Sequence, residues 1–310
     1  MIYVNVLTKP PFKSKETVLA DVAGVKKVGI VGSGLMGSGI AQVAAVAGFD
    51  VVLYDAAEGA AESAVQKIEA ALERQVARGR FEADAVAPAV ARISVAPTLD
   101  GLKDADAVIE AIIENVDIKR DTFAQIAAVV GPETLLATNT SAISISAIAG
   151  NGDYADRVIG MHFFSPVPAM QLCEIIRGLA TSDETVARAR ALAEAFGKTT
   201  ILVNRDTAGF VTSRLITVLT QEAARIVDEG LATARDVDLA CTLGFGHKMG
   251  PLETADLTGV DVAYRAGKMI YDQTGNPQFA PPQLLTRMVA AGLLGRKTGK
   301  GFYDHTEAGK

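Results

Sequence analysis

Residues 26–55 read KKVGIVGSGLMGSGIAQVAAVAGFDVVLYD, and this stretch decides the fold of the first part of the chain. Val28–Val31 is a short apolar run rich in branched side chains, which predicts a buried parallel strand. Residues 32–37, GSGLMG, follow at once and lead into an alanine-rich helix. Asp50–Tyr54 predicts a second strand. The order of strand, glycine turn, helix and strand is typical of a Rossmann-like unit.

The glycine turn predicts a dinucleotide site. Gly32 allows the tight turn, Gly34 lets the backbone approach a pyrophosphate, and Gly37 lets the helix pack closely on the strand. The start of the helix, at Leu35 and Met36, offers backbone N–H groups and the positive end of the helix dipole. A lone glycine pattern marks nothing more than a turn in many proteins, but here its strands and helix stand in the required order.

Asp55, at the end of the second strand, favours NAD over NADP. Its carboxylate is placed to accept hydrogen bonds from an adenosine ribose, and it repels a 2′-phosphate. Ala56 and Ala57 offer no arginine to receive such a phosphate.

Composition limits the class of protein. The chain has 310 residues, of which 49% are hydrophobic, and a net charge of −6. That length predicts two domains, and the negative charge argues against a nucleic-acid partner. Cys173 and Cys241 give no disulfide framework, and three scattered histidines give no metal cluster. Without a run of eighteen apolar residues, no membrane span is expected. We expect a soluble cytoplasmic protein.

The pattern of strands and helices predicts an α/β protein in two domains. Strands and helices alternate up to a strand at Thr199–Val203, after which the pattern is helical. We therefore expect a Rossmann-like dinucleotide-binding domain over residues 26–205 and an all-helical domain over residues 206–310. Residues 1–25 form an extension to which the sequence assigns no role. Two local expectations are that Asp117 caps a helix over residues 119–130 and that residues 251–274 form one helix.

A histidine with a plausible catalytic setting lies in residues 160–176, GMHFFSPVPAMQLCEII. Two apolar runs flank Pro166 and Pro168, which force a connection between them. His162 and Glu174 are each six residues from Pro168, so a hairpin would make them cross-strand neighbours. A carboxylate beside an imidazole fixes its tautomer and favours its protonated form, as a general acid or base requires. Taken alone, the pair fits a satisfied strand-end histidine and a surface acid at least as well.

Two further groups of polar residues have two readings each. Ser141 follows a strand at Leu135–Thr138, where ligands bind in such sheets, but a serine before ISISAIA is as naturally a helix cap. The basic side chains on the helix after Asp55 form either a solvated face or a phosphate contact; they are Lys67, Arg74, Arg78 and Arg80.

With these pieces in place, the chain resembles the L-3-hydroxyacyl-CoA dehydrogenase family, and especially its single-function bacterial 3-hydroxybutyryl-CoA members. The resemblance runs from about Lys27 to Tyr303. Its specific motifs, in order, are GSGLMG, IIENVDIK, ATNTSAISI, GMHFFSPVPAMQLCEII, DTAGFVTSRLI, MGPLETADLTGVD and GLLGRKTGKGFYD.

The resemblance implies an NAD-dependent oxidation of a short-chain L-3-hydroxyacyl-CoA. His162 would take the proton of the 3-hydroxyl, Glu174 would orient the imidazole, and Ser141 would bind the reacting oxygen. The cofactor site would include Asp55 and three residues around the nicotinamide half, namely Glu114, Lys119 and Asn139. A homodimer through the helical domain is also implied.

The same resemblance implies which residues contact the substrate, and some of these positions depart from the family pattern. Arg78 stands where the family usually has a lysine that contacts coenzyme A, while Ala71 replaces a serine contact. In DTAGFVTSRLI, Ala208 stands where proline is usual, and Ser213 replaces a substrate-binding asparagine. Serine keeps a donor but is shorter and lacks the amide.

Two other functions remain open at this point. One is a dehydrogenase of a free hydroxy acid or sugar acid, of the L-gulonate type, which would leave the coenzyme A contacts unused. The other is a non-catalytic dinucleotide-binding protein, like the crystallins that resemble this family.

Overall fold

The structure is a computed structural model that describes residues 24–306. Apart from its last two residues, the expected extension over residues 1–25 lies outside the described residues. The chain divides into two compact units between Asp206 and Thr207, and each unit is described by itself.

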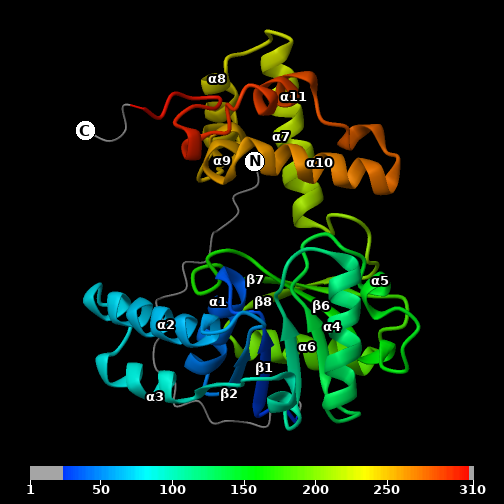
Figure 1. The fold of residues 1–310 in the computed structure, drawn as a ribbon. Coiled ribbons are helices and arrows are strands. Elements are labelled where there is room, and N and C mark those ends of the chain that lie inside the picture. Colours follow the sequence, from blue (N-terminus) through cyan, green and yellow to red (C-terminus); the bar gives the residue numbers. More distant parts are fainter. Residues whose placement is uncertain (1–23, 307–310) are drawn as a thin grey trace. The chain divides into compact units, whose positions relative to one another are not determined.

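The first unit is built on an eight-stranded sheet with the order β3-β2-β1-β4-β5-β6-β7-β8 within the described residues (Figure 1). All neighbouring strands are parallel except β6 and β7, which pair antiparallel. The strands are β1 Lys27–Val31, β2 Asp50–Tyr54, β3 Ile93–Val95, β4 Ala107–Glu110, β5 Leu135–Thr138, β6 Val158–Phe163, β7 Leu172–Arg177 and β8 Thr199–Val203. This order, with β1 beside both β2 and β4, confirms the predicted Rossmann-like fold.

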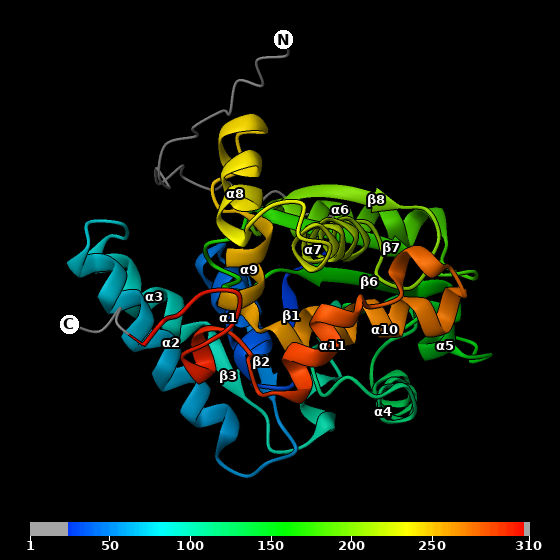
Figure 2. The same cartoon turned by 90° about the horizontal axis from the view of Figure 1, so that it is seen from above.

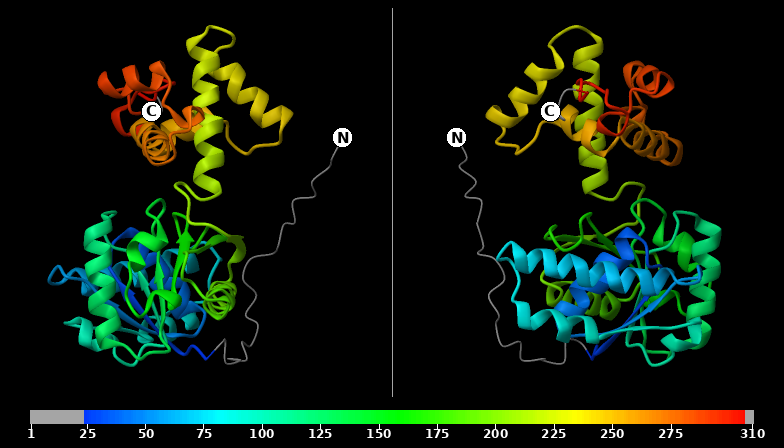
Figure 3. Two further views of the ribbon diagram at one scale, coloured as in Figure 1. Left: turned by 90° about the vertical axis from the view of Figure 1, so that its right-hand side faces the viewer. Right: turned by 60° about the vertical axis from the view of Figure 1, so that its left-hand side comes forward.

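Helices cover both faces of this sheet (Figure 3). They are α1 Leu35–Val46, α2 Ala60–Ala77, α3 Val86–Ala91, α4 Val116–Val129, α5 Ile145–Ala149 and α6 Asp183–Ala195. Helices α1, α2, α3 and α6 share one apolar core with the sheet. Phe196 joins parts of this core that are distant in sequence, since its ring contacts both Phe49 and Phe163. Burial on both faces explains why strands such as Val28–Val31 are apolar throughout.

The start of α4 differs from the expectation. Asn115, not Asp117, is the N-cap, and its Oδ1 accepts the backbone N–H groups of Asp117 and Ile118. The helix therefore begins at Val116, three residues before the expected start. Asparagine and aspartate cap helices about equally well, and the acid in the first turn suits the helix dipole.

The second unit is helical, as expected. Its helices are α7 Thr212–Asp228, α8 Ala234–Leu239 with a π-helical continuation Ala240–Gly244, α9 Pro251–Thr258, α10 Val260–Thr274 and α11 Gln283–Ala290. Figure 2, which looks nearly along α7, shows the other helices around it. The single helix expected over residues 251–274 is wrong, because Gly259 at φ +111° separates α9 from α10. No helix in the described part of the chain has both the length and the apolar character to cross a bilayer.

Candidate active site

The turn between β1 and α1 has the shape that a dinucleotide requires. Gly32 adopts φ +96°, and a Cβ there would lie 2.7 Å from the carbonyl oxygen of Ala111. A Cβ on Gly37 would lie only 1.8 Å from the carbonyl oxygen of Gly32, so α1 can approach β1 only through glycine. A Cβ on Gly34 would meet no atom within 4 Å, which leaves open space at the N-terminus of α1. An open helix start with free backbone N–H groups, here including those of Leu35 and Met36, is a favourable place for a pyrophosphate.

Asp55 lies beside this turn at the end of β2. Its Oδ2 accepts the backbone N–H and the hydroxyl of Ser33, both at 2.7 Å, and its Oδ1 accepts the N–H of Ala57 at 2.9 Å. Partial burial works to raise the pKa of Asp55, but these hydrogen bonds outweigh it and lower the pKa on balance. The carboxylate is therefore a fixed negative charge next to the glycine turn, which suits a ribose and disfavours a 2′-phosphate.

His162 and Glu174 are paired across the antiparallel strands β6 and β7, so the hairpin expected from the sequence is confirmed. His162 Nδ1 lies 2.7 Å from Glu174 Oε2. Glu174 is fully buried and His162 is 7% exposed, so little water screens the contact. Since Nδ1 contacts a carboxylate, it carries the proton of the neutral imidazole.

Most of the residues expected to take part in the reaction line a cavity of about 330 Å³. His162 lines it together with Phe163, Phe164 and Ser165 from the end of β6 and the loop that follows. The other lining residues come from the ends of β4 and β5 and from the start of α1; they are Ala111, Ile112, Glu114, Asn139, Ser141 and Met36. The first unit thus brings together Met36, next to the glycine turn, with four of the polar residues expected at the nicotinamide and the substrate oxygen; Lys119 and Glu174 do not line the cavity.

The polar residues after β5 are held by hydrogen bonds. Asn139 Oδ1 accepts the backbone N–H of Phe163 at 2.8 Å, which ties the end of β5 to the end of β6. Ser141 is exposed, and its backbone N–H donates to Glu114 Oε1 at 3.1 Å. The cap of α5 is Ser144, whose hydroxyl accepts from the N–H of Ala147. Ser141 therefore does not cap a helix, and its side chain is available to the cavity.

A buried ion pair behind this cavity was not expected. Glu110, fully buried at the end of β4, accepts from Lys119 Nζ at 2.6 Å and from the Thr138 hydroxyl at 2.8 Å. Lys119 is 1% exposed, and its Nζ also lies 3.5 Å from Glu114. Glu114 in turn accepts the hydroxyl of Thr140 at 2.5 Å. Lys119 thus joins two carboxylates and positions Glu114. An acid at the end of the apolar run AVIE was the one sequence signal for Glu110.

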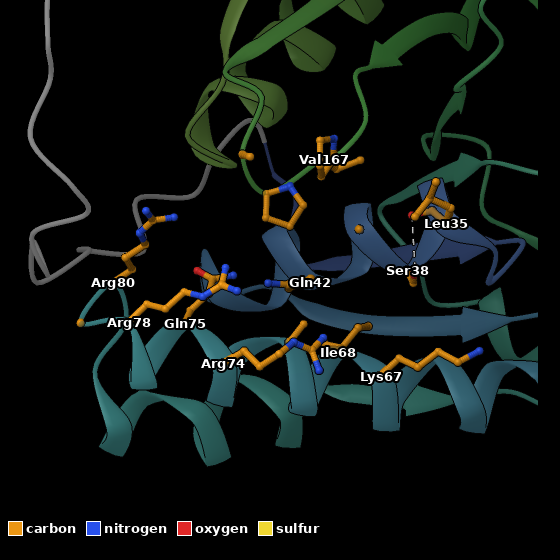
Figure 4. A pocket seen from close by; sticks show the side chains of 16 residues that line it. Leu35, Ser38, Gln42, Lys67, Ile68, Arg74, Gln75, Arg78, Arg80 and Val167 are labelled. Atoms are coloured by element: carbon orange, nitrogen blue, oxygen red, sulfur yellow. Dashed lines mark hydrogen bonds between the residues drawn. The ribbon is translucent and has the colours of Figure 1, made fainter. Parts of the chain in front are cut away.

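A second cavity, of about 700 Å³, lies between α1, α2 and the β6–β7 loop. Figure 4 shows basic side chains along α2 and the turn after it, with Val167 on the opposite side. These are the basic residues noted in the sequence, Lys67, Arg74, Arg78 and Arg80, and all four are exposed. Ala71 also lines the cavity and contributes no polar atom. Four positive side chains at one cavity can bind a multiply charged phosphate ligand.

The two positions at which DTAGFVTSRLI departs from the family pattern lie in the second unit, and Ser213 is the one expected near the substrate. Ser213 is half-buried in the first turn of α7. Ala208 is buried in a small core with Ile270 and Phe279. Alanine at this position is therefore accommodated by packing.

The geometry of the glycine turn, Asp55 and the His162 cavity defines an NAD-dependent dehydrogenase. The NAD-binding domain of 3-hydroxyacyl-CoA dehydrogenase matches residues 27–207, and the C-terminal domain of the same family matches residues 209–305. The chain belongs to the 3-hydroxyacyl-CoA dehydrogenase family.

Three relatives illustrate the similarity. The chain is 43% identical to a probable 3-hydroxybutyryl-CoA dehydrogenase of Bacillus subtilis, over 91% of this chain and 98% of the relative. It is 41% identical to a 3-hydroxybutyryl-CoA dehydrogenase of Bradyrhizobium diazoefficiens, over 92% and 97% of the two chains. The crystal structure of (S)-3-hydroxybutyryl-CoA dehydrogenase from Ralstonia eutropha superposes with a TM-score of 0.88 at 42% identity, covering 91% of this chain and all of that one.

Proposed function

We propose that this chain oxidises short-chain L-3-hydroxyacyl-CoA, such as 3-hydroxybutyryl-CoA, to the 3-ketoacyl-CoA with NAD, and catalyses the reverse reaction. The observation that carries the proposal is the buried His162–Glu174 pair, which opens into the cavity that also contains Met36, next to the glycine turn. A general base and a dinucleotide turn at one cavity are what hydride removal from an alcohol requires. The names of the two bacterial relatives support the acyl-CoA substrate and the short chain.

His162 acts as the general base in the oxidation. Because Nδ1 is bound to Glu174, Nε2 is the nitrogen that takes the proton of the 3-hydroxyl as the hydride leaves C3. The imidazole becomes an imidazolium, and the carboxylate of Glu174, 2.7 Å away, stabilises the new charge. The Ser141 hydroxyl donates a hydrogen bond to the reacting oxygen and so orients the alcohol toward His162. In the reverse reaction the same imidazolium returns the proton.

The cofactor is held by residues that follow four strands, β1, β2, β4 and β5, and by Lys119 of α4. The turn residues Gly32, Gly34 and Gly37 and the helix start at Leu35 and Met36 would hold the pyrophosphate, and Asp55 the adenosine ribose. Glu114, Lys119 and Asn139 would surround the nicotinamide half, with Lys119 acting mainly through Glu114. When bound, NAD supplies the hydride acceptor.

The basic cavity would bind the phosphates of coenzyme A. Arg78 is the principal candidate, and Arg74, on the same side of α2, also lines the cavity. Their guanidinium groups match phosphate geometry. We assign cofactor binding to residues 26–205. We assign dimerisation to the helical domain over residues 206–310, which also contributes Ser213 to substrate binding. Two buried free cysteines, Cys173 and Cys241, support a reducing, cytoplasmic location.

The test is a spectrophotometric assay with acetoacetyl-CoA and NADH, comparing wild type with His162→Ala. Oxidation of NADH by the wild type that falls at least a hundredfold in the variant supports the reaction and its base. Free acetoacetate with NADH, and free L-gulonate with NAD and NADH formation as the readout, serve as parallel substrates. Turnover of a free acid with none of the thioester favours a free hydroxy-acid dehydrogenase. NADH binding without turnover of any of the three favours a non-catalytic role.

A further inference from the structure

The loop between β6 and β7 forms part of two walls. Residues Phe164 and Ser165 line the His162 cavity, and Pro166–Ala169 line the basic cavity. The shape of this one loop therefore bears on both the reacting end and the phosphate end of a coenzyme A thioester. What fixes its shape is accordingly a question about substrate binding.

A buried lysine outside the loop holds it. Lys198, just before β8, is 8% exposed, and its Nζ donates to the carbonyl oxygen of Val167 at 2.6 Å and to that of Met170 at 2.8 Å. Both acceptors are neutral main-chain carbonyl groups rather than carboxylates. Burial lowers the pKa of Lys198. Burying an ammonium group in such a setting costs free energy, and the stability of a surface loop alone would not require one. Its two bonds fix the half of the loop that lines the basic cavity.

The loop is also seated on the cofactor-binding helix. Val167 is 2% exposed, and a Cβ on Gly39 of α1 would lie 2.9 Å from the Val167 Cβ. Inside the loop, the N–H groups of Ala169 and Met170 both donate to the carbonyl of Pro166. Lys198 thus presses a tightly turned segment against α1, with the basic side chains of α2 on the other side of the cavity.

We propose that Lys198 is a positioning residue for coenzyme A binding, which acts by fixing the loop of residues 166–170 as one wall of the basic cavity. This rests on the proposed function, since it assumes that the basic cavity receives the nucleotide of the thioester. The role concerns coenzyme A rather than NAD, because the two carbonyls that Lys198 holds belong to Val167 and Met170, and neither residue is among those assigned to NAD.

The experiment compares wild type, Lys198→Met and the matched control Lys103→Met, which makes the same change at an exposed lysine. The dissociation constant of free CoA is measured by calorimetry and that of NADH by fluorescence. In Lys198→Met we expect the dissociation constant of CoA to rise about tenfold, because the two charged hydrogen bonds that fix the loop are lost, while that of NADH stays within about twofold. Lys103→Met changes neither.

Equal weakening of both ligands in Lys198→Met, or unchanged CoA binding, overturns the proposal. If Lys198→Met is insoluble, Lys198→Gln, which keeps an NH₂ donor on a shorter side chain, is measured with the same expectation. Turnover of acetoacetyl-CoA is recorded separately. If the wild type binds CoA but does not turn over the thioester, the proposed reaction is wrong, while the role of Lys198 is still tested. If the wild type binds no CoA, the positioning role is wrong.

Discussion

Glu174 places a negative charge in a buried part of the site that water does not reach. It is fully buried, and its Oε2 lies 2.7 Å from Nδ1 of the His162 imidazole. A carboxylate in this position holds the ring in one tautomer and favours the imidazolium that forms when the substrate loses its proton. The value of such a charge is greatest in a dry site, because the dielectric there is low. In the proposed mechanism the pair therefore acts as one catalytic unit.

The variant Glu174→Gln keeps the size of the side chain and removes its charge. We expect kcat to fall by about a hundredfold or more, with the fold retained, because the imidazolium loses its buried counter-charge. Steady-state assays with acetoacetyl-CoA and NADH measure this, and Glu184→Gln, at an exposed glutamate of α6, is the matched control. A kcat within threefold of wild type would show that Glu174 only fills space.

At the residue scale the sequence reveals some of the candidate site and conceals the rest. His162 and Glu174 were found because two prolines mark the turn and the pair is symmetric about it. Glu110 and Lys119 were not paired, because they are nine residues apart on a strand and a helix, and only packing brings them together. Lys198 was missed for the same reason, since its acceptors are backbone carbonyls about thirty residues away.

At the scale of elements, the β1–α1 turn makes two glycines that look alike in sequence differ in function. Gly37 is required by packing, since a Cβ would meet the Gly32 carbonyl oxygen at 1.8 Å. Gly34 has no such neighbour within 4 Å, and its φ of −63° suits any residue. Its requirement therefore comes from a ligand rather than from the fold.

Substitution of each glycine by alanine separates the two causes. Gly37→Ala should lower the free energy of unfolding by about 1–3 kcal/mol or more, because α1 must move away from β1. Gly34→Ala should leave stability within about 1 kcal/mol, yet weaken NADH binding about tenfold or more by filling the space for the pyrophosphate. Urea unfolding and NADH fluorescence titration measure the two effects. A Gly34→Ala protein with normal NADH affinity would place the cofactor elsewhere.

Helix α10 is fixed at its start by a charged cluster. Asp261 is 7% exposed and pairs with Arg265 one turn later and with Lys297 of the short 3₁₀ turn Arg296–Thr298. Burial works to raise the pKa of Asp261, but the hydrogen bonds and charges of Lys297 and Arg265 outweigh it and hold the pKa below 3.8. The pairing therefore stabilises the fold while the carboxylate is ionised.

The variant Asp261→Asn should lose about 1.5–3 kcal/mol of unfolding free energy at neutral pH, as for hydrogen bonds to a charged group. Because the folded-state pKa is lower than the unfolded value of 3.8, the stabilisation is complete above pH 3.8 and is lost as the pH falls through the folded-state value. Urea melts of both proteins should differ equally at pH 7 and pH 5 and less at pH 3.5. A difference that grows on acidification would contradict the assignment.

The sequence also predicts elements better than their ends. The strands and the glycine turn were clear because apolar runs and glycines repeat in a fixed order. The break between α9 and α10 was missed, since Gly259 interrupts a pattern whose apolar period continues on both sides. Asn115 and Asp117 are both good caps two residues apart, and which one serves is decided by where the chain leaves β4.

At the scale of the whole molecule, the second unit has apolar side chains that its own helices leave uncovered. Leu243, on the π-helical continuation of α8, is 82% exposed, and Phe245, which follows it, is 72% exposed. Leu239, Leu257 of α9 and Leu215 of α7 are also exposed. Apolar surface of this extent is typical of an interface, and a second copy of the chain is the partner that we propose.

Negative charges in place of the two most exposed of these side chains should separate the copies. We expect wild type to have the mass of a dimer by light scattering after gel filtration, and Leu243→Glu with Phe245→Glu to have that of a monomer, because burying two carboxylates costs several kcal/mol. Leu179→Glu, at a leucine of the first unit that is 92% exposed, is the matched control and should stay dimeric. A monomeric wild type, or a double variant that remains a dimer, would show that the copies do not associate through this surface. If the monomer retains NADH binding, the first unit needs no partner to hold its cofactor.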